Sequence, residues 1–186
     1  MGRLLLGIDV GTSGCKVAVF DLNGNVLATS TKSYPVYYPA PGYAEQDPHE
    51  WWNAACEAIN EAIQAGRVDV KRIAGIGVDG ISGCATPLDR NGEILHRTPI
   101  WMDSRTSDIC AETVEKIGFE EIFQVSGNTF VPTHSTPKIL WFKKNKPDVY
   151  RNTYRFLQSN SFIVYKLTGK MSQDKSQGFG LQCFNM

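Results

Sequence analysis

The chain has 186 residues, of which 42% are hydrophobic, so it is long enough to bury one substantial core. Its 19 Lys and Arg residues balance 19 Asp and Glu residues, and the formal net charge is zero. This balance removes the electrostatic argument for binding nucleic acid or an anionic membrane surface. No apolar stretch approaches the length of a membrane span, so we expect neither a nucleic-acid partner nor a membrane.

The cysteines indicate a reducing compartment. They are odd in number, scattered, and contain no CxxC pair: Cys15, Cys56, Cys84, Cys110 and Cys183. The N-terminus leads directly into a predicted strand without the layout of a signal peptide. We therefore expect a cytoplasmic protein.

The first 30 residues predict an antiparallel meander. Residues 4–8 form a short apolar run that is typical of a buried strand, and Asp9 follows at its end. Residues 16–21 alternate with period two, residues 23–25 make a turn, and residues 26–29 resume the alternation. Small residues join the first two strands: Gly11, Thr12, Ser13 and Gly14.

This glycine turn has the chemistry of a phosphate site. It is neither a Walker A loop nor a dinucleotide fingerprint, because both of those open a helix. Small residues let backbone N–H groups and the hydroxyls of Thr12 and Ser13 approach an anion, and Lys16 adds a positive charge. Asp9 is placed to hold Mg²⁺ near the phosphates. The simpler alternative is a tight hairpin with an exposed aspartate.

A helix is predicted from Pro48 to Gly66. Asp47 is a candidate N-cap, Pro48 suits the first helical position, and Glu50 stands where a capping box needs an acid. The apolar face predicted from helical spacing comprises Trp52, Ala55, Cys56, Ile59 and Ile63. We interpret it as a core helix, whose tryptophans need no ligand to explain them.

Residues 73–78 predict a second buried strand. The order of strand, helix and strand then places Asp79 and the loop 81–84 at the carboxyl edge of a sheet, where α/β folds bind ligands. Asp79 and this loop are therefore placed where a ligand would bind.

A second cluster comprises Trp101, Asp103 and Arg105. In the simpler interpretation, Asp103 or Ser104 caps the helix that follows and Arg105 pairs with Asp103. In the alternative, Trp101 forms an apolar wall for a sugar, and Asp103 and Arg105 bind its hydroxyls directly or orient neighbouring residues. The residues alone favour neither interpretation.

The remainder of the chain is predicted to be mainly helical. A hairpin comes first, with its turn at 89–92, and residues 155–157 form a short strand. The predicted helices span 106–117, 119–125, 136–146 and 160–167, the last ending at Gly169. Residues 181–184 are expected to form a strand or loop, as if the chain stops within a larger architecture.

At this point an ordered set of motifs resembles the FGGY carbohydrate kinases, and most closely their xylulokinase-like members. The resemblance covers nearly the whole chain and rests on residues 7–13 with Lys16, 45–48 with 51–52, 75–77, 101–105, 126–128 with 137–141, and 167–169. It implies an actin-like, ribonuclease H-like α/β domain. It also implies phosphorylation, with ATP and Mg²⁺, of a hydroxyl on a ketose such as xylulose or on a related sugar or polyol.

The resemblance also implies roles for particular residues. Asp9 is similar to the Mg²⁺–phosphate aspartate of the family, and the turn with Lys16 is similar to its phosphate hairpin. Trp101, Asp103 and Arg105 are similar to part of the sugar pocket. The family's sugar-reading pair, Met-His in xylulokinases and Arg-Glu in glycerol kinases, is replaced here by Ser82 and Gly83, and Asp79 is a candidate for the missing polar contact.

Members of the family are much longer than this chain. Their general-base aspartate and adenine-binding domain correspond to positions after residue 186, so we expect residues 1–186 to be a truncated N-terminal domain with little turnover by itself. A homodimer is one expected assembly. Two alternatives stay open: another actin-like ATPase, and a non-catalytic binding fragment.

Overall fold

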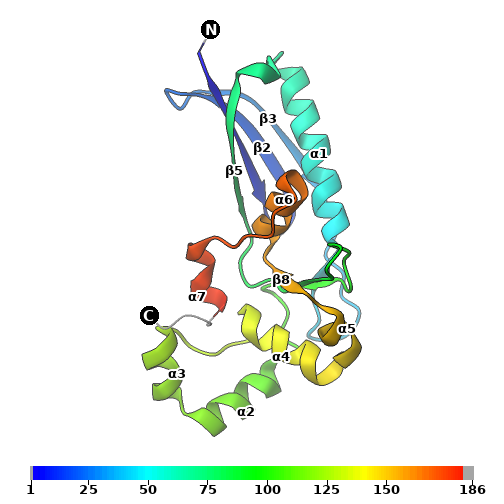
Figure 1. The fold of residues 1–186 in the computed structure, drawn as a ribbon, viewed down its shortest axis with the longest axis vertical. Helices are drawn as coiled ribbons and strands as arrows, with labels where there is room; N and C mark the ends of the chain where they lie inside the picture. Colours follow the sequence, from blue (N-terminus) through cyan, green and yellow to red (C-terminus); the bar gives the residue numbers. More distant parts are fainter. Residues whose placement is uncertain (1, 182–186) are drawn as a thin grey trace.

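The computed structural model describes residues 2–181, and a mixed four-stranded sheet occupies one end of it (Figure 1). The strand order is β3–β2–β1–β5. β1 (Leu4–Val10), β2 (Gly14–Asp21) and β3 (Val26–Ser33) form the predicted antiparallel meander, and β5 (Ile73–Gly80) runs parallel to β1. The predicted meander is therefore confirmed.

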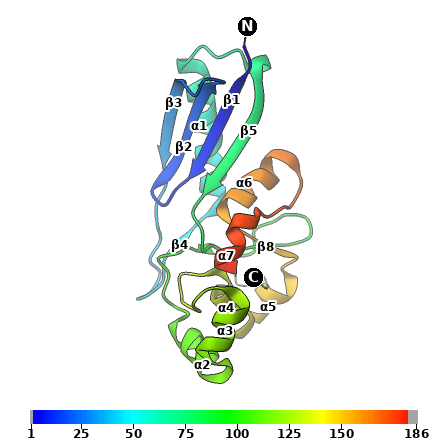
Figure 2. The same cartoon turned by 90° about the vertical axis from the view of Figure 1, so that its left-hand side faces the viewer.

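The pleat of β1 divides its side chains between two environments. Leu4, Leu6, Ile8 and Val10 are buried in one core cluster with residues of α1 (Pro48–Ala65). The side chains between them, including that of Asp9, lie on the opposite face of the sheet. In Figure 2 the sheet faces the viewer and α1 lies behind it. The face that carries Asp9 is therefore open.

The predicted start of α1 is correct, and its predicted apolar face is correct only in part: Trp52 and Ile59 pack at the edge of the core and Ala55 is buried in it. Asp47 caps the helix by accepting a hydrogen bond from the His49 N–H. Glu50 makes no capping box, because its carboxylate accepts from the Tyr37 hydroxyl. The buried residues are Pro48, Trp51, Ala54, Ala55, Ala58 and Ala62, which share only Ala55 with the predicted set. Alanines let the helix lie close to the sheet, so the larger apolar residues flank the interface.

β5 is not the buried strand that its apolar sequence predicts. It is an edge strand with β1 as its neighbour in the sheet, and its residues are half-buried or exposed. Ile76 has 49% of its surface exposed. The number of neighbours around a strand sets its burial, and composition alone does not reveal that number.

Outside the four-stranded sheet and α1, the molecule is built from short strands and helices. β4 (Glu45–Gln46) pairs with β7 (Thr98–Pro99), and β6 (Thr86–Leu88) pairs with β8 (Arg155–Leu157). The helices are α2 (Ser107–Ile117), α3 (Phe119–Ser126), α4 (Ser135–Asn145), α5 (Pro147–Asn152) and α6 (Ser159–Thr168). Neither Asp103 nor Ser104 caps α2, because Thr106 occupies the N-cap position and makes no side-chain capping bond.

Three short helical segments complete the described chain: η1 (Val70–Arg72), η2 (Lys175–Gln177) and α7 (Gly178–Leu181). Leu181 is thus helical, and the other residues of the strand or loop expected at 181–184 lie outside the described residues. Within residues 2–181, no helix combines the length and apolarity needed to cross a membrane.

Replacing Trp51 tests which face of α1 is buried. The Trp51 side chain is fully buried, so Trp51→Ala should lower the free energy of unfolding by about 3–5 kcal/mol. Trp52→Ala is the matched control and should cost clearly less, because Trp52 is only partly buried. Urea unfolding of both variants measures the difference. Equal losses would contradict this assignment of the buried face.

Candidate functional site

The turn between β1 and β2 is held in place by hydrogen bonds that its carbonyl oxygens accept from side chains. The Gly11 oxygen accepts from the Tyr34 hydroxyl at 2.6 Å, and the Thr12 oxygen accepts from the side-chain amide of Gln46 at 2.8 Å. The Gly11 N–H closes the turn on the Gly14 oxygen. Gly14 is required here, because a Cβ at this position would lie 2.5 Å from the Lys32 oxygen.

These bonds set the direction of the backbone donors. In a planar trans peptide the N–H points opposite to the C=O of the preceding residue. Because the Gly11 and Thr12 oxygens point towards Tyr34 and Gln46, the N–H groups of Thr12 and Ser13 point away from these partners. Backbone donors that point away from their own supporting residues suit an anion.

Gln46 connects this turn to the core. Its side chain is fully buried, and its Oε1 accepts from the Trp51 indole at 3.1 Å while its Nε2 donates to Thr12. Sequence reasoning assigned no role to Gln46 or Tyr34. The only sequence signal was the motif at 45–48, whose resemblance to the family gave no contact.

Asp9, Lys16 and Asp79 lie together on the open face of the sheet. Asp9 is paired with Lys16 on β2 and with Asp79 on β5. All three residues are exposed and line one cavity of about 560 Å³. The structure thus groups Asp79 with the predicted phosphate residues.

Trp101 joins the turn to the second predicted cluster. Its indole N–H donates to the Thr12 hydroxyl at 3.0 Å, and 46% of its surface is exposed. Gly83 lies against it, since a Cβ on Gly83 would be 3.4 Å from the Trp101 Cβ. An exposed aromatic face therefore stands beside the phosphate-type turn, next to the loop that contains Ser82 and Gly83.

Position 83 has no room for a side chain. Gly83 has φ +73°, and a Cβ there would lie 2.1 Å from the Thr133 oxygen. Ser82 is exposed, so its hydroxyl is the one side-chain polar group that this pair offers. The segment before α4 thus occupies the space beside this loop.

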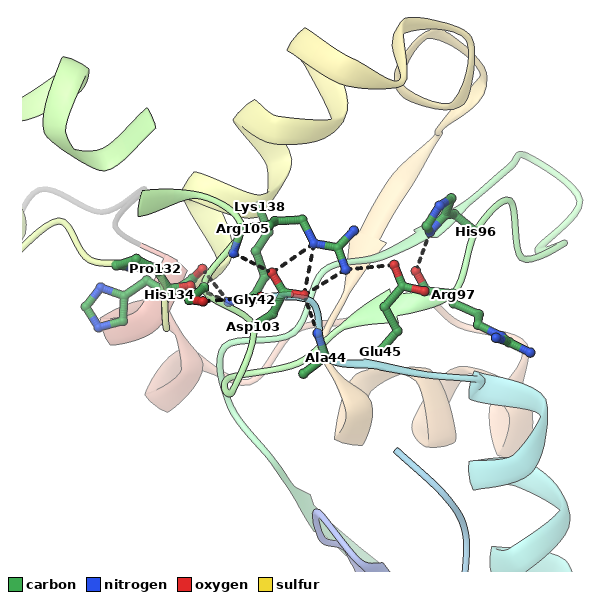
Figure 3. A network of polar contacts seen from close by, with 11 residues as sticks. Gly42, Ala44, Glu45, His96, Arg97, Asp103, Arg105, Pro132, His134 and Lys138 are labelled. Carbon is green, nitrogen blue, oxygen red and sulfur yellow. Dashed lines mark hydrogen bonds and ion pairs between the residues drawn. The ribbon is translucent and has the colours of Figure 1, made fainter. Parts of the chain in front are cut away.

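Asp103 and Arg105 form a buried network with Glu45 (Figure 3). The Asp103 carboxylate lies between the Arg105 guanidinium and the Ala44 N–H, and the Arg105 Nη2 is shared, donating to Asp103 and to Glu45 at 2.7 Å each. The guanidinium also stacks over the rings of Tyr43 and Trp141, at 3.7 and 4.7 Å from their centroids.

The contacts of this network join parts of the protein to one another. Asp103 and the Arg105 side chain are each only 1% exposed, and the two are mutually bonded as the simpler interpretation proposed. The geometry favours a role in fixing the segment that carries Trp101 over direct contact with a ligand. A direct sugar contact by either residue stays a prediction.

Lys138 is a second buried cation, and it holds the segment that packs against Gly83. Its ammonium donates to the carbonyl oxygens of Pro132 and His134, at 2.6 and 3.1 Å. The residue is 1% exposed, and this burial lowers its pKa from 10.5 to about 8. Lys138 thus clamps the backbone on both sides of Thr133.

The mixed sheet and its helices define an α/β protein, and the comparisons identify its family. The chain matches the model for the N-terminal domain of the FGGY family of carbohydrate kinases over residues 4–186. It is 30% identical over 178 residues to the xylulose kinase of Bacillus subtilis, covering 96% of this chain and 36% of the relative. The glycerol kinase of Thermococcus onnurineus is also 30% identical, over 190 residues, with coverages of 100% and 38%.

The solved structures agree. The xylulose kinase from Rhodospirillum rubrum superposes with a TM-score of 0.93 at 25% identity, covering 99% of this chain and 38% of that one. The chain belongs to the FGGY family of carbohydrate kinases, and its fold is the actin-like α/β fold of that family. It spans well under half the length of these relatives.

Removing Arg105 should be strongly destabilising. Arg105→Ala leaves the Asp103 and Glu45 carboxylates without their shared cation, which should cost about 3–5 kcal/mol of unfolding free energy. The control is Arg151→Ala, whose ion pair with Asp148 is exposed and should contribute under about 1 kcal/mol. Thermal and urea unfolding measure both, and a small loss for Arg105→Ala would contradict a structural network.

The buried amine of Lys138 predicts a specific pH dependence. Between pH 8 and about 10.5 the unfolded chain keeps a proton that the folded chain has released, so the free energy of unfolding should rise with pH. The full contribution is roughly 3 kcal/mol at the alkaline end of the window. Lys138→Met should remove this rise.

The measurement is the difference in unfolding free energy between the wild type and Lys138→Met from pH 7.5 to 10. Burial also raises the pKa of Cys15 to about 11 and that of Cys84 to about 12. These thiols lower stability above pH 9 in both proteins, so their contribution cancels in the difference apart from the coulombic coupling between Lys138 and Cys84. A difference that does not change with pH would contradict the prediction.

Proposed function

We propose that this chain is the N-terminal domain of an ATP-dependent sugar kinase, which transfers the γ-phosphoryl group to a hydroxyl of a ketose such as xylulose or of a related sugar or polyol. The observation that carries the proposal is the turn at residues 11–14, which directs two N–H groups away from its supporting residues beside Asp9. Membership of the carbohydrate kinase family supports it.

In this proposal the nucleotide phosphates bind at the turn. Thr12 and Ser13 donate from backbone and hydroxyl groups, Gly11 keeps the turn small, and Lys16 adds a positive charge. Phosphoryl transfer needs positioned groups more than covalent chemistry, so a rigid turn is suited to the task.

The donor set also fits Mg²⁺. Within residues 2–181, no group of three or more His, Cys, Asp or Glu side chains is arranged to hold a metal ion alone. Mg²⁺ at phosphate sites commonly uses one or two carboxylates, with phosphate oxygens and waters as its other ligands. Asp9 would hold the ion, whose charge would offset that of the phosphates.

The acceptor sugar is proposed to bind next to the turn. Trp101 supplies the apolar wall, Ser82 supplies a hydroxyl, and the lack of a side chain at Gly83 shapes the pocket. Asp103 and Arg105 hold the segment that presents Trp101. The bond from Trp101 to Thr12 fixes this wall against the phosphate end.

Further parts of the proposal concern the whole protein. The chain spans 36% to 38% of its relatives, and we propose that the general base and the adenine site belong to a longer protein. The isolated chain should then show little or no turnover. A cytoplasmic location accords with the free thiols of the described cysteines, and we propose a homodimer as the assembly.

The test is a coupled assay of ADP release by the longer protein that contains this chain, across ketoses, polyols and sugar acids. We expect one class of sugar to stimulate release, and Asp9→Ala to lower it by at least about a hundredfold. Asp108→Ala is the matched control, because it removes an exposed carboxylate on α2.

Two outcomes would overturn the proposal. ATP turnover at the same rate with every sugar would favour an actin-like ATPase. No ATP binding or turnover under any condition would favour a binding fragment without catalysis. Robust sugar-dependent ADP formation by residues 1–186 alone would contradict only the expectation that the base lies elsewhere.

A further inference from the structure

The two aspartates at the open face of the sheet are direct neighbours. β1 and β5 are parallel, and their register pairs Asp9 with Asp79. Adjacent strands lie about 4.8 Å apart, and paired residues in a regular stretch of sheet project from the same face. Lys16 is paired with Asp9 on the other side, so three charged residues form one row across β2, β1 and β5.

Open space adjoins this row. Gly7 and Gly77 pair with one another two residues before the aspartates, and a Cβ on Gly77 would meet no atom within 4 Å. These glycines line the same cavity of about 560 Å³ as the two carboxylates. Beside the aspartates the cavity wall is therefore bare backbone at these two glycines, with Ala18 and Phe20 lining it further along the sheet.

The charges of the row are not balanced by the described protein. Neither Asp9 nor Asp79 forms a salt bridge within residues 2–181, although Lys16 is next to Asp9. Like charges on neighbouring strands repel. One Asp79 oxygen accepts from the Gly80 N–H at 2.8 Å, which fixes the carboxylate locally and leaves its second oxygen available. A cation between the two aspartates would remove the repulsion.

We propose that Asp79 is a second carboxylate ligand of the divalent cation that Asp9 binds, and this inference rests on the proposed function. Two carboxylates with phosphate oxygens and water make a complete oxygen ligand set for Mg²⁺. Lys16, at the other end of the row, is left to face the phosphates. This assigns Asp79 to the phosphate end of the site in place of the sugar contact that the sequence suggested.

The placement of the loop after β5 supports this assignment. Ser82 and Gly83, the candidate sugar residues, do not line the cavity that holds Asp9 and Asp79. Gly83 instead contacts Trp101 and Thr133. Asp79 and this loop therefore belong to two different parts of the site, although only a few residues separate them.

The experiment measures Mn²⁺ binding to the 186-residue chain by electron paramagnetic resonance of the free ion, with Mg²⁺ as competitor. We expect saturable binding by the wild type, and Asp79→Asn and Asp9→Asn should each weaken it by at least about tenfold. Asp79→Asn keeps an oxygen that can accept from Gly80, so the local backbone bond is preserved. Asp108→Asn removes the same charge from α2 and should leave binding unchanged.

Asp79→Ser is the second variant, with circular dichroism to verify folding, and it should weaken Mn²⁺ binding as Asp79→Asn does. Wild-type affinity in folded Asp79 variants, or no saturable binding by the wild type, would overturn the inference. The readout needs neither sugar nor ATP. If Mn²⁺ binding depends on both aspartates while the longer protein shows no sugar-dependent ADP release, the metal site stands and the kinase proposal fails.

Discussion

The alternation of side chains along β1 is the constraint on which the site depends. Every second residue from Leu4 to Val10 enters the core beneath α1, and this burial places Asp9 on the opposite face. A slip of one residue in register would bury the carboxylate and expose the core side chains. Partners on both sides, antiparallel β2 and parallel β5, prevent such a slip. Hydrophobic burial therefore orients a charged group without touching it.

Buried polar side chains fix the position of the backbone around the site in a similar way. The Gln46 side-chain amide hydrogen-bonds to Trp51 and to Thr12, and the Arg105 guanidinium forms ion pairs with Asp103 and Glu45. A buried polar group that loses its partner is costly, so each of these residues locks the segments that it joins. Glu45 and Gln46 are adjacent in β4, which makes this two-residue strand the common support of the turn and of the Trp101 segment.

Much of this architecture could be predicted from local patterns. Period-two alternation identified the meander, and Asp47 with Pro48 located the start of α1. The buried face of α1 was predicted only in part because alanines carry a weak hydrophobic signal beside a tryptophan such as Trp52. Contacts between segments that are distant in sequence could not be predicted from such patterns. No local pattern reveals that Thr133 lies against Gly83, or that Gln46 reaches Thr12.

The contact between Gly83 and Thr133 links two loops that are far apart in sequence. Lys138 holds the carbonyl groups on both sides of Thr133, so this segment cannot recede to admit a larger residue at position 83 without releasing a buried cation. Replacing residues 82 and 83 by those of a relative would therefore also require changes in the segment around Thr133. The loop at 82–83, the segment around Thr133 and Lys138 behind it are therefore one packing unit, and a change in any one of them has to be accommodated by the other two.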